Sequence, residues 1–257
     1  MNRLNQLFAK KNKDLLSIYF TAGYPDLNCT VDIAETLERN GVDFLEIGFP
    51  YSDPVADGPT IQESSQKALD SGMTLKLLFE QLKDLRKRVS IPILLMGYVN
   101  PMVQYGVERF CQTAAEVGVD GVIVPDLPMY EYESMYKPVF EKYGLSNIFL
   151  VTPQTSAERI RKIDSLSNSF IYLLSSSSIT GGSLNVSDSI EGYYQRVKAM
   201  ELKNPIVIGF GINSNKTYSK ACEYANGAIV GSAFVKYLGS REDYMAGIPE
   251  FIQNIKG

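Results

Sequence analysis

The sequence predicts an α/β protein built as a closed (β/α)8 barrel. Apolar, β-rich segments recur eight times along the 257 residues, and helical periodicities lie between them. The segments are apolar on both faces, as parallel strands covered by helices are, and eight such units in about 250 residues fit a closed barrel. An open doubly wound sheet is the alternative, because it requires a miscount of only two strands.

The candidate strands follow one another at similar intervals, at residues 15–23, 42–50, 91–99, 119–128, 146–153, 170–178, 205–212 and 227–235. The clearest helical pattern between them spans residues 75–89, and the last one spans residues 244–255. The N-terminal segment "MNRLNQLFAKKNKD" spaces its apolar residues as a short amphipathic helix does. Without a Pro/Ser-rich linker or a shift in composition, we expect a single barrel domain over residues 1–257.

Composition excludes several classes of protein. The longest apolar runs are far shorter than the roughly 20 residues that span a bilayer, and no signal-peptide core is present, so we expect a cytoplasmic chain without membrane contact. A net charge of −4 argues against a general nucleic-acid binder. Cys29, Cys111 and Cys222 lie far apart, which indicates reduced packing thiols and neither a disulfide framework nor a metal site.

The chain contains no histidine. If it is an enzyme, proton transfer near neutral pH must therefore use carboxylates, tyrosine, lysine, cysteine, water or the substrate itself.

Glycine-rich segments lie at the ends of the last three candidate strands, where a barrel of this kind builds its site. They are "SSSSITGGS" at 175–183, "GFGIN" at 209–213 and "VGSAFV" at 230–235, the last leading into a helix. Glycines let backbone N–H groups approach an anion, and a helix N-terminus adds a favourable dipole. Each loop alone is also explained by a tight turn, but together they predict a ligand that carries phosphate.

Glu46 lies inside the apolar strand at 42–50, on the same face as Phe44 and Gly48. A carboxylate beneath the helices would be buried at a cost of several kcal/mol, so the barrel mouth is favoured. Partial desolvation there would raise the pKa of Glu46 and make it a proton shuttle. A structural, hydrogen-bonded glutamate is the alternative. In the following loop "SDPVADGP", local chemistry does not rank Asp53 against Asp57.

Several motifs resemble those of one family over essentially the whole chain. They are "FTAGYP" (20–25), "LEIGFPYSDPVADGPTIQ" (45–62), "LLMGYVNP" (94–101), "GVIVPDLP" (121–128), "IYLLSSSSITG" (171–181), "GFGI" (209–212) and "GSAFVK" (231–236). This pattern is similar to that of the tryptophan synthase alpha chain family. The resemblance implies retro-aldol cleavage of indole-3-glycerol phosphate into indole and glyceraldehyde 3-phosphate, in L-tryptophan biosynthesis.

The resemblance also implies roles for individual residues. Glu46 would be the acid/base, and Asp57 would accept a hydrogen bond from the indole N–H and stabilise the protonated ring. Tyr172 would face the site as a third catalytic residue, with packing in the barrel core as its alternative. The substrate contacts would be Tyr19 and Leu95 beside the indole, and Thr180, Gly181, Gly211, Gly231 and Ser232 at the phosphate.

The same resemblance implies a tryptophan synthase beta chain as partner, in an α2β2 tetramer. Pyridoxal phosphate would belong to that partner, so we expect no cofactor on this chain. Two rival interpretations share the fold. One is another phosphate-binding barrel, such as phosphoribosyl-anthranilate isomerase or indole-glycerol-phosphate synthase, and the acidic loop at 52–59 argues against it. The other is a non-catalytic allosteric subunit, which would be expected to have lost Glu46 or Asp57.

Overall fold

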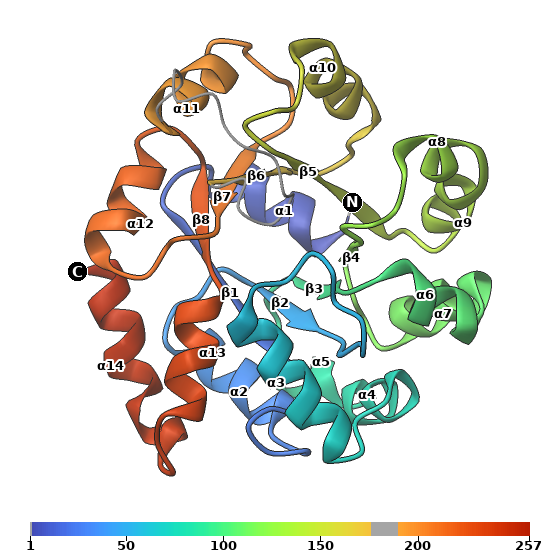
Figure 1. The fold of residues 1–257 in the computed structure, drawn as a ribbon, viewed down its shortest axis with the longest axis vertical. Coiled ribbons are helices and arrows are strands. Elements are labelled where there is room, and N and C mark those ends of the chain that lie inside the picture. Colours follow the sequence, from blue (N-terminus) through green and yellow to red (C-terminus); the bar gives the residue numbers. More distant parts are fainter. Residues whose placement is uncertain (1, 176–189) are drawn as a thin grey trace.

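The computed structural model describes residues 2–175 and 190–257. In this part of the chain eight parallel strands form a closed barrel in the order β1 to β8, and β1 pairs with both β2 and β8 (Figure 1). The closed barrel is therefore confirmed, and the open sheet is excluded. The strands are β1 Leu15–Thr21, β2 Phe44–Gly48, β3 Ile93–Met96, β4 Gly121–Ile123, β5 Ser146–Val151, β6 Ile171–Leu174, β7 Ile206–Gly209 and β8 Gly227–Val230.

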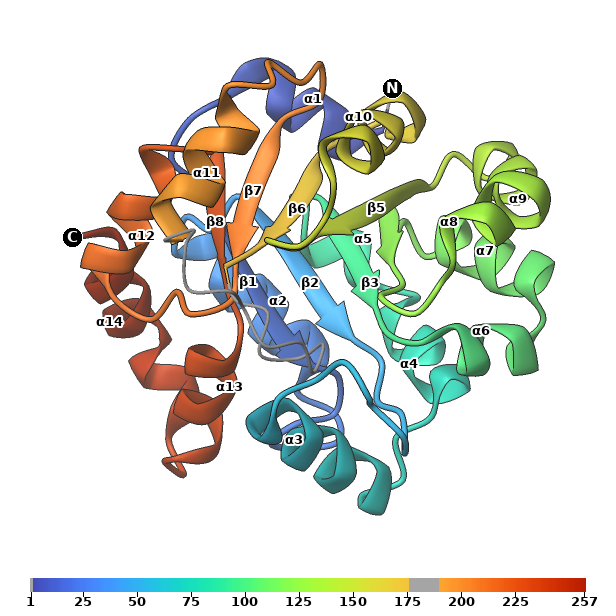
Figure 2. The same ribbon diagram turned by 45° about the horizontal axis from the view of Figure 1, so that its top comes forward.

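Helices surround the barrel, and the strand arrows all run toward one end of it (Figure 2). The pattern predicted as one helix at 75–89 forms two, because α4 ends at Leu82 and α5 begins at Leu85. The helices are α1 Arg3–Lys10, α2 Thr30–Arg39, α3 Pro59–Asp70, α4 Leu75–Leu82, α5 Leu85–Arg88, α6 Val99–Tyr105, α7 Val107–Glu116, α8 Met129–Glu131, the π-helix η1 Tyr132–Tyr136, α9 Lys137–Lys142, α10 Ala157–Leu166, α11 Ile190–Lys198, α12 Asn215–Cys222, α13 Ser232–Gly239 and α14 Tyr244–Lys256.

The strands are shorter than their apolar segments. The segment at 119–128 contains only β4, and the chain then turns, with the backbone N–H of Leu127 donating to the carbonyl of Val124 at 3.2 Å. Val124 lies outside the strand but is still buried, with only 5% of its surface exposed. Apolar residues that leave a strand and still pack in the core lengthen the sequence pattern beyond the strand itself.

The predicted short N-terminal helix is confirmed as α1, which closes the end of the barrel where the strands begin. The ring of Phe8 lies 6.2 Å from that of Phe44 and 5.6 Å from that of Phe170, centroid to centroid. Phe44 opens β2 and Phe170 directly precedes β6. Three aromatic rings therefore fill this end of the barrel, and a ligand must enter from the other end.

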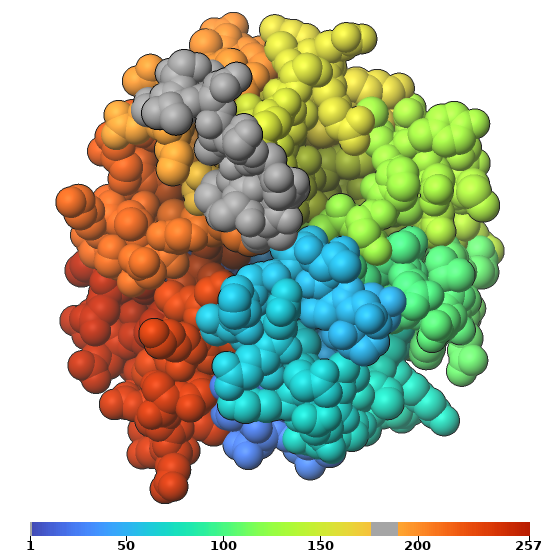
Figure 3. Space-filling view, viewed as in Figure 1, coloured from blue at the N-terminus to red at the C-terminus, as the bar shows by residue number. Residues whose placement is uncertain are grey.

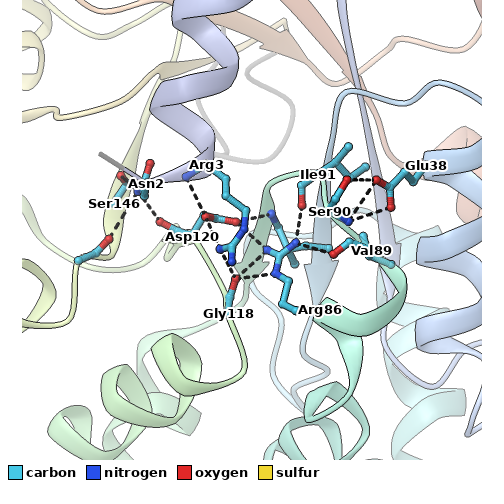
Figure 4. A network of polar contacts seen from close by, with 12 residues as sticks. Asn2, Arg3, Glu38, Arg86, Val89, Ser90, Ile91, Gly118, Asp120 and Ser146 are labelled. Carbon is cyan, nitrogen blue, oxygen red and sulfur yellow. Dashed lines mark hydrogen bonds and ion pairs between the residues drawn. The ribbon is translucent and has the colours of Figure 1, made fainter.

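A polar network fixes α1 to the same end of the barrel (Figure 4). Asp120, 2% exposed, accepts hydrogen bonds from Arg86 at 2.7 Å, from the Arg3 guanidinium at 3.2 Å and from the backbone N–H of Ile93 at 3.0 Å. Asn2 donates to the Asp120 carbonyl at 3.0 Å. The buried carboxylate thus has several partners, as a buried charge requires. This network joins α1 to β3, β4 and α5.

The structure also bears on the cysteines, on membrane-spanning helices and on metal-binding groups. Cys29, Cys111 and Cys222 are free and buried, as predicted for packing thiols. None of the described helices is both long and apolar enough to cross a membrane. Within residues 2–175 and 190–257, no group of three or more acidic or cysteine side chains is arranged to hold a metal ion.

Candidate active site

A cavity of about 610 Å³ opens at the C-terminal ends of the strands, where the sequence predicted the site. Figure 3 shows a hollow near the centre of this face, between the orange-red α13 and the cyan segment that contains α3. The walls come from β1, the loop after β2, β3, β6, the loop after β7 and the start of α13. Among the residues that line it are Tyr19, Asp57, Met96, Tyr172, Gly211 and Ser232.

Glu46 lies inside the barrel, as the alternation along its strand predicted. Its backbone pairs with Tyr19 on β1 and Leu94 on β3. The side chain is fully buried, and neither carboxylate oxygen has a hydrogen-bond partner among the described residues. A structural, hydrogen-bonded role is therefore not what this geometry supports. Burial raises the pKa of Glu46 to about 8, so the carboxyl group holds a proton at neutral pH and can release it.

Tyr19 and Tyr172 line the cavity next to Glu46. Burial is the largest cause of the raised pKa of both hydroxyls, and the carboxylates of Asp57 and Glu46 raise it further. Both side chains therefore stay neutral over the physiological range. Each hydroxyl lies against a glycine, that of Tyr19 against Gly48 and that of Tyr172 against Gly209. A Cβ atom on Gly48 would lie 2.2 Å from the Tyr19 oxygen, and one on Gly209 would lie 2.2 Å from the Tyr172 oxygen. Any larger residue at these two positions would push a ring out of place.

Asp57 lines the same cavity, whereas Asp53 is exposed and lies outside it. Oδ2 of Asp57 accepts a hydrogen bond from the Tyr98 hydroxyl at 2.9 Å. Burial raises the pKa of Asp57 to about 6, and the bond from Tyr98 opposes that rise. The structure thus separates two acids that local sequence chemistry left equal.

One end of the cavity has the features of an anion site. Gly211 and Gly231 line it, and α13 begins there at Ser232 without a side-chain cap. The first N–H groups of a helix have no partner within the helix and favour an anion. Gly211 has φ +73°, a left-handed conformation that glycine adopts readily. Lys236 is the one lysine or arginine among the cavity-lining residues that the structure describes.

Residues 5–254 match the family of the tryptophan synthase alpha chain. The chain belongs to this family. Its members are carbon–carbon lyases that act on indole-3-glycerol phosphate in tryptophan biosynthesis, which excludes the rival barrel enzymes.

Relatives of the family resemble the chain over its full length. The tryptophan synthase alpha chain of Flavobacterium psychrophilum is 56% identical over 255 residues, covering 99% of this chain and 100% of that protein. That of Bacteroides thetaiotaomicron is 49% identical over 243 residues, covering 95% of each. The solved structure of tryptophan synthase subunit alpha from Legionella pneumophila superposes with a TM-score of 0.88 at 32% identity, covering 100% of this chain and 97% of that chain.

The resemblance implies that Leu95 lies beside the indole, but Leu95 does not line the cavity. Leu95 pairs with Ile47 and is fully buried, and the neighbouring Met96 lines the cavity instead. Because Met96 pairs with Gly48 on the face that also carries Glu46, the strand alternation turns Met96 inward and Leu95 toward the helices. Of these two residues, Met96 is therefore the one that borders the cavity. Thr180 and Gly181 lie outside the described residues.

Sequence reasoning missed Tyr98 and Lys236 as site residues. Both stand in motifs that resemble those of the alpha-chain family, "LLMGYVNP" and "GSAFVK", but the resemblance implied roles only for other residues of these motifs. Lys236 comes four residues after Ser232, one helical turn along α13, and that spacing could have indicated it. Nothing in the sequence indicates that Tyr98 meets a loop 41 positions away.

Proposed function

We propose that this chain cleaves indole-3-glycerol phosphate into indole and glyceraldehyde 3-phosphate, with Glu46 as the acid/base and Asp57 as the electrostatic partner. One observation carries the proposal. A fully buried carboxyl group without a hydrogen-bond partner, Glu46, adjoins a cavity that also contains Asp57 and, at one end, an uncapped helix N-terminus. Because such a carboxyl group costs stability, a catalytic use accounts for its presence.

Protons would move through Glu46 in both directions. The neutral carboxyl group gives its proton to indole C3, which makes the ring an electron acceptor. The resulting carboxylate then takes the proton of the glycerol hydroxyl, a C=O bond forms, and the C–C bond breaks with its electron pair returning to the ring. Indole and glyceraldehyde 3-phosphate leave, and Glu46 holds a proton again. A pKa of about 8 suits a group that gives and regains a proton near neutral pH.

Asp57 would stabilise the charge that this proton transfer creates. Above about pH 6 its carboxylate is ionised, and it can accept a hydrogen bond from the indole N–H while the ring is cationic. Tyr19, Met96 and Tyr172 give the cavity the apolar walls that the ring requires. Tyr172 acts in this proposal as a neutral neighbour of Glu46 that shapes the catalytic space.

The substrate phosphate would bind at the end of the cavity where α13 begins. Backbone N–H groups at Gly211, Gly231 and Ser232 would hold it, together with Thr180 and Gly181 from the loop after β6. Lys236 adds the positive charge that these neutral donors lack. A phosphate dianion would then be bound mainly by a helix N-terminus and assisted by one cation.

A tryptophan synthase beta chain is the partner we propose, in an α2β2 tetramer with pyridoxal phosphate on the beta chain. Val55, Val103 and Tyr130 are large apolar side chains exposed at 77%, 49% and 79%, and they belong to three successive strand–loop–helix units. An exposed apolar set of this kind favours a protein partner. We also propose that residues 1–257 act as one domain in the cytoplasm, where buried free thiols stay reduced.

The test is release of indole from indole-3-glycerol phosphate by the purified chain, alone and with a beta chain. Glu46→Gln should lower kcat by about 10² to 10⁴ while the substrate still binds. Glu63→Gln makes the same change at an exposed position of α3 and should leave kcat unchanged. No indole from the wild-type chain under either condition would refute the lyase proposal, and near-normal turnover of Glu46→Gln would refute the assignment of the shuttle.

A further inference from the structure

Tyr98 connects the loop after β3 to the catalytic loop after β2. It is 3% exposed and stands directly before α6. Its hydroxyl donates to Oδ2 of Asp57 at 2.9 Å and accepts from the backbone N–H of Ala56, also at 2.9 Å. Because a backbone N–H can only donate, the hydroxyl keeps its own proton for the Asp57 carboxylate. One oxygen atom thereby binds the side chain of Asp57 and the backbone next to it.

The ring of Tyr98 is held independently of Asp57. It packs on Tyr51 with 5.4 Å between ring centroids. The Tyr51 hydroxyl in turn accepts a hydrogen bond from the side-chain amide of Asn100, in the first turn of α6, at 2.9 Å. The backbone of Tyr98 is fixed between β3 and α6, and its ring packs on Tyr51 at the start of the loop that carries Asp57, so contacts other than the bond to Asp57 place the hydroxyl.

The two oxygens of Asp57 have different surroundings. Oδ2 is bound to Tyr98, whereas Oδ1 makes no hydrogen bond to a described residue, and Asp57 lines the cavity. The backbone of Asp57 has further support, because its N–H donates to the Pro54 carbonyl at 3.1 Å and its carbonyl accepts from the Gln62 side-chain amide at 2.8 Å, but neither bond holds the carboxylate. Without Tyr98, rotation about the side-chain bonds of Asp57 would interchange the two oxygens.

We propose that Tyr98 is a positioning residue for the cleavage reaction: its hydroxyl fixes Oδ2 of Asp57 and leaves Oδ1 to accept the N–H of the bound indole ring. This inference rests on the proposed function. It explains how an acid on a loop can be held in the geometry that electrostatic stabilisation requires. It also assigns a second effect to the hydroxyl, because a hydrogen bond donated to a carboxylate favours its ionised form.

The charge state of Asp57 depends on few neighbours. Tyr19 from β1 and Tyr172 from β6 face it and remain neutral, Glu46 from β2 is protonated near neutral pH, and Lys236 lines the other end of the cavity. Loss of the Tyr98 hydroxyl should therefore raise the pKa of Asp57 above its value of about 6. That change gives the proposal a readout that a structural role would not produce.

The experiment compares Tyr98→Phe with Tyr143→Phe in the release of indole from indole-3-glycerol phosphate. Tyr143→Phe also removes a hydroxyl that donates to a carboxylate, that of the exposed Glu108 at 2.6 Å, and because Tyr143 does not line the cavity its activity and pH profile should match the wild type. Tyr98→Phe should lower kcat by about ten- to hundred-fold, the effect of a lost hydrogen bond to a charged group. The acid limb of its kcat/KM profile should move to higher pH.

A double-mutant cycle decides whether Tyr98 acts through Asp57. In the background of Asp57→Asn, the added change Tyr98→Phe should cost less than about two-fold, because the carboxylate it served is already gone. An equal cost in both backgrounds, or an unmoved acid limb, would overturn the proposal even where activity falls. A wild-type chain that releases no indole would instead refute the proposed function, which keeps the two failures distinct.

Discussion

Replacing Glu46 with glutamine should make the protein more stable, and increasingly so as the pH rises. The native chain keeps the Glu46 proton up to about pH 8, whereas an unfolded chain releases it near 4.5. Between these values the unfolded state binds fewer protons than the native state, so the free energy of unfolding of the wild type falls with rising pH. The rise in the pKa of Glu46 corresponds to a loss of about 5 kcal/mol in the free energy of unfolding of the wild type once the pH exceeds 8. If water reaches the carboxylate, the loss is roughly half of that.

Urea denaturation at pH 5, 7 and 9 measures this effect. Glutamine has nearly the same shape and cannot ionise, so Glu46→Gln and the wild type should differ least at pH 5. By pH 9 the variant should exceed the wild type by several kcal/mol. Glu63→Gln on the exposed face of α3 is the matched control, and its curve should run parallel to that of the wild type. Parallel curves for Glu46→Gln as well would show that the carboxyl group is not buried as described.

Other predictions test the remaining parts of the site and the fold. Asp57→Asn should lower kcat by about 10² to 10³ whereas Asp53→Asn leaves it unchanged, and equal effects in indole release would contradict the ranking of the two acids. The wild-type kcat/KM should be bell-shaped, lost as pH falls through about 6 when Asp57 is protonated and as pH rises through about 8 when Glu46 is ionised. Lys236→Gln should raise KM by about three- to ten-fold at low salt with kcat unchanged, and the effect should shrink as salt is added; Lys236→Arg should restore KM. Asp120→Asn should lower the free energy of unfolding by about 3 kcal/mol, since it leaves Arg86 without its buried partner, while activity per folded molecule is retained.

The sequence was sufficient for the barrel because its strands are apolar on both faces, a pattern that surface strands do not show. It was less reliable at strand ends, where residues such as Val124 stay buried after the strand has finished. Alternation along β2 correctly turned Glu46 inward, since period-2 reasoning needs only the strand itself. The sequence did not reveal that Leu95 points away from the cavity, because the direction of its side chain depends on the register of β3 against β2, which pairs Met96 with Gly48.

Contacts between distant loops explain the rest. The choice of Asp57 over Asp53 depends on Tyr98, a partner on another loop, and no local property of "SDPVADGP" contains that information. The family resemblance selected Asp57 correctly as the acid in the cavity without providing the physical cause. Burial and one hydrogen bond now provide it.

The seam between β1 and β8 has a consequence for the growing chain. Leu15 pairs with Gly227, and a Cβ atom on Gly227 would lie 2.2 Å from the Leu15 carbonyl oxygen, so the two strands meet at very close range. Asn226 also donates to the carbonyl of Asn12 at 2.7 Å. During synthesis β1 therefore keeps one unpaired edge until β8 has left the ribosome. A nascent chain that stalls before Gly227 would present the open edges of β1 and β7 to other chains, the kind of surface that chaperones protect.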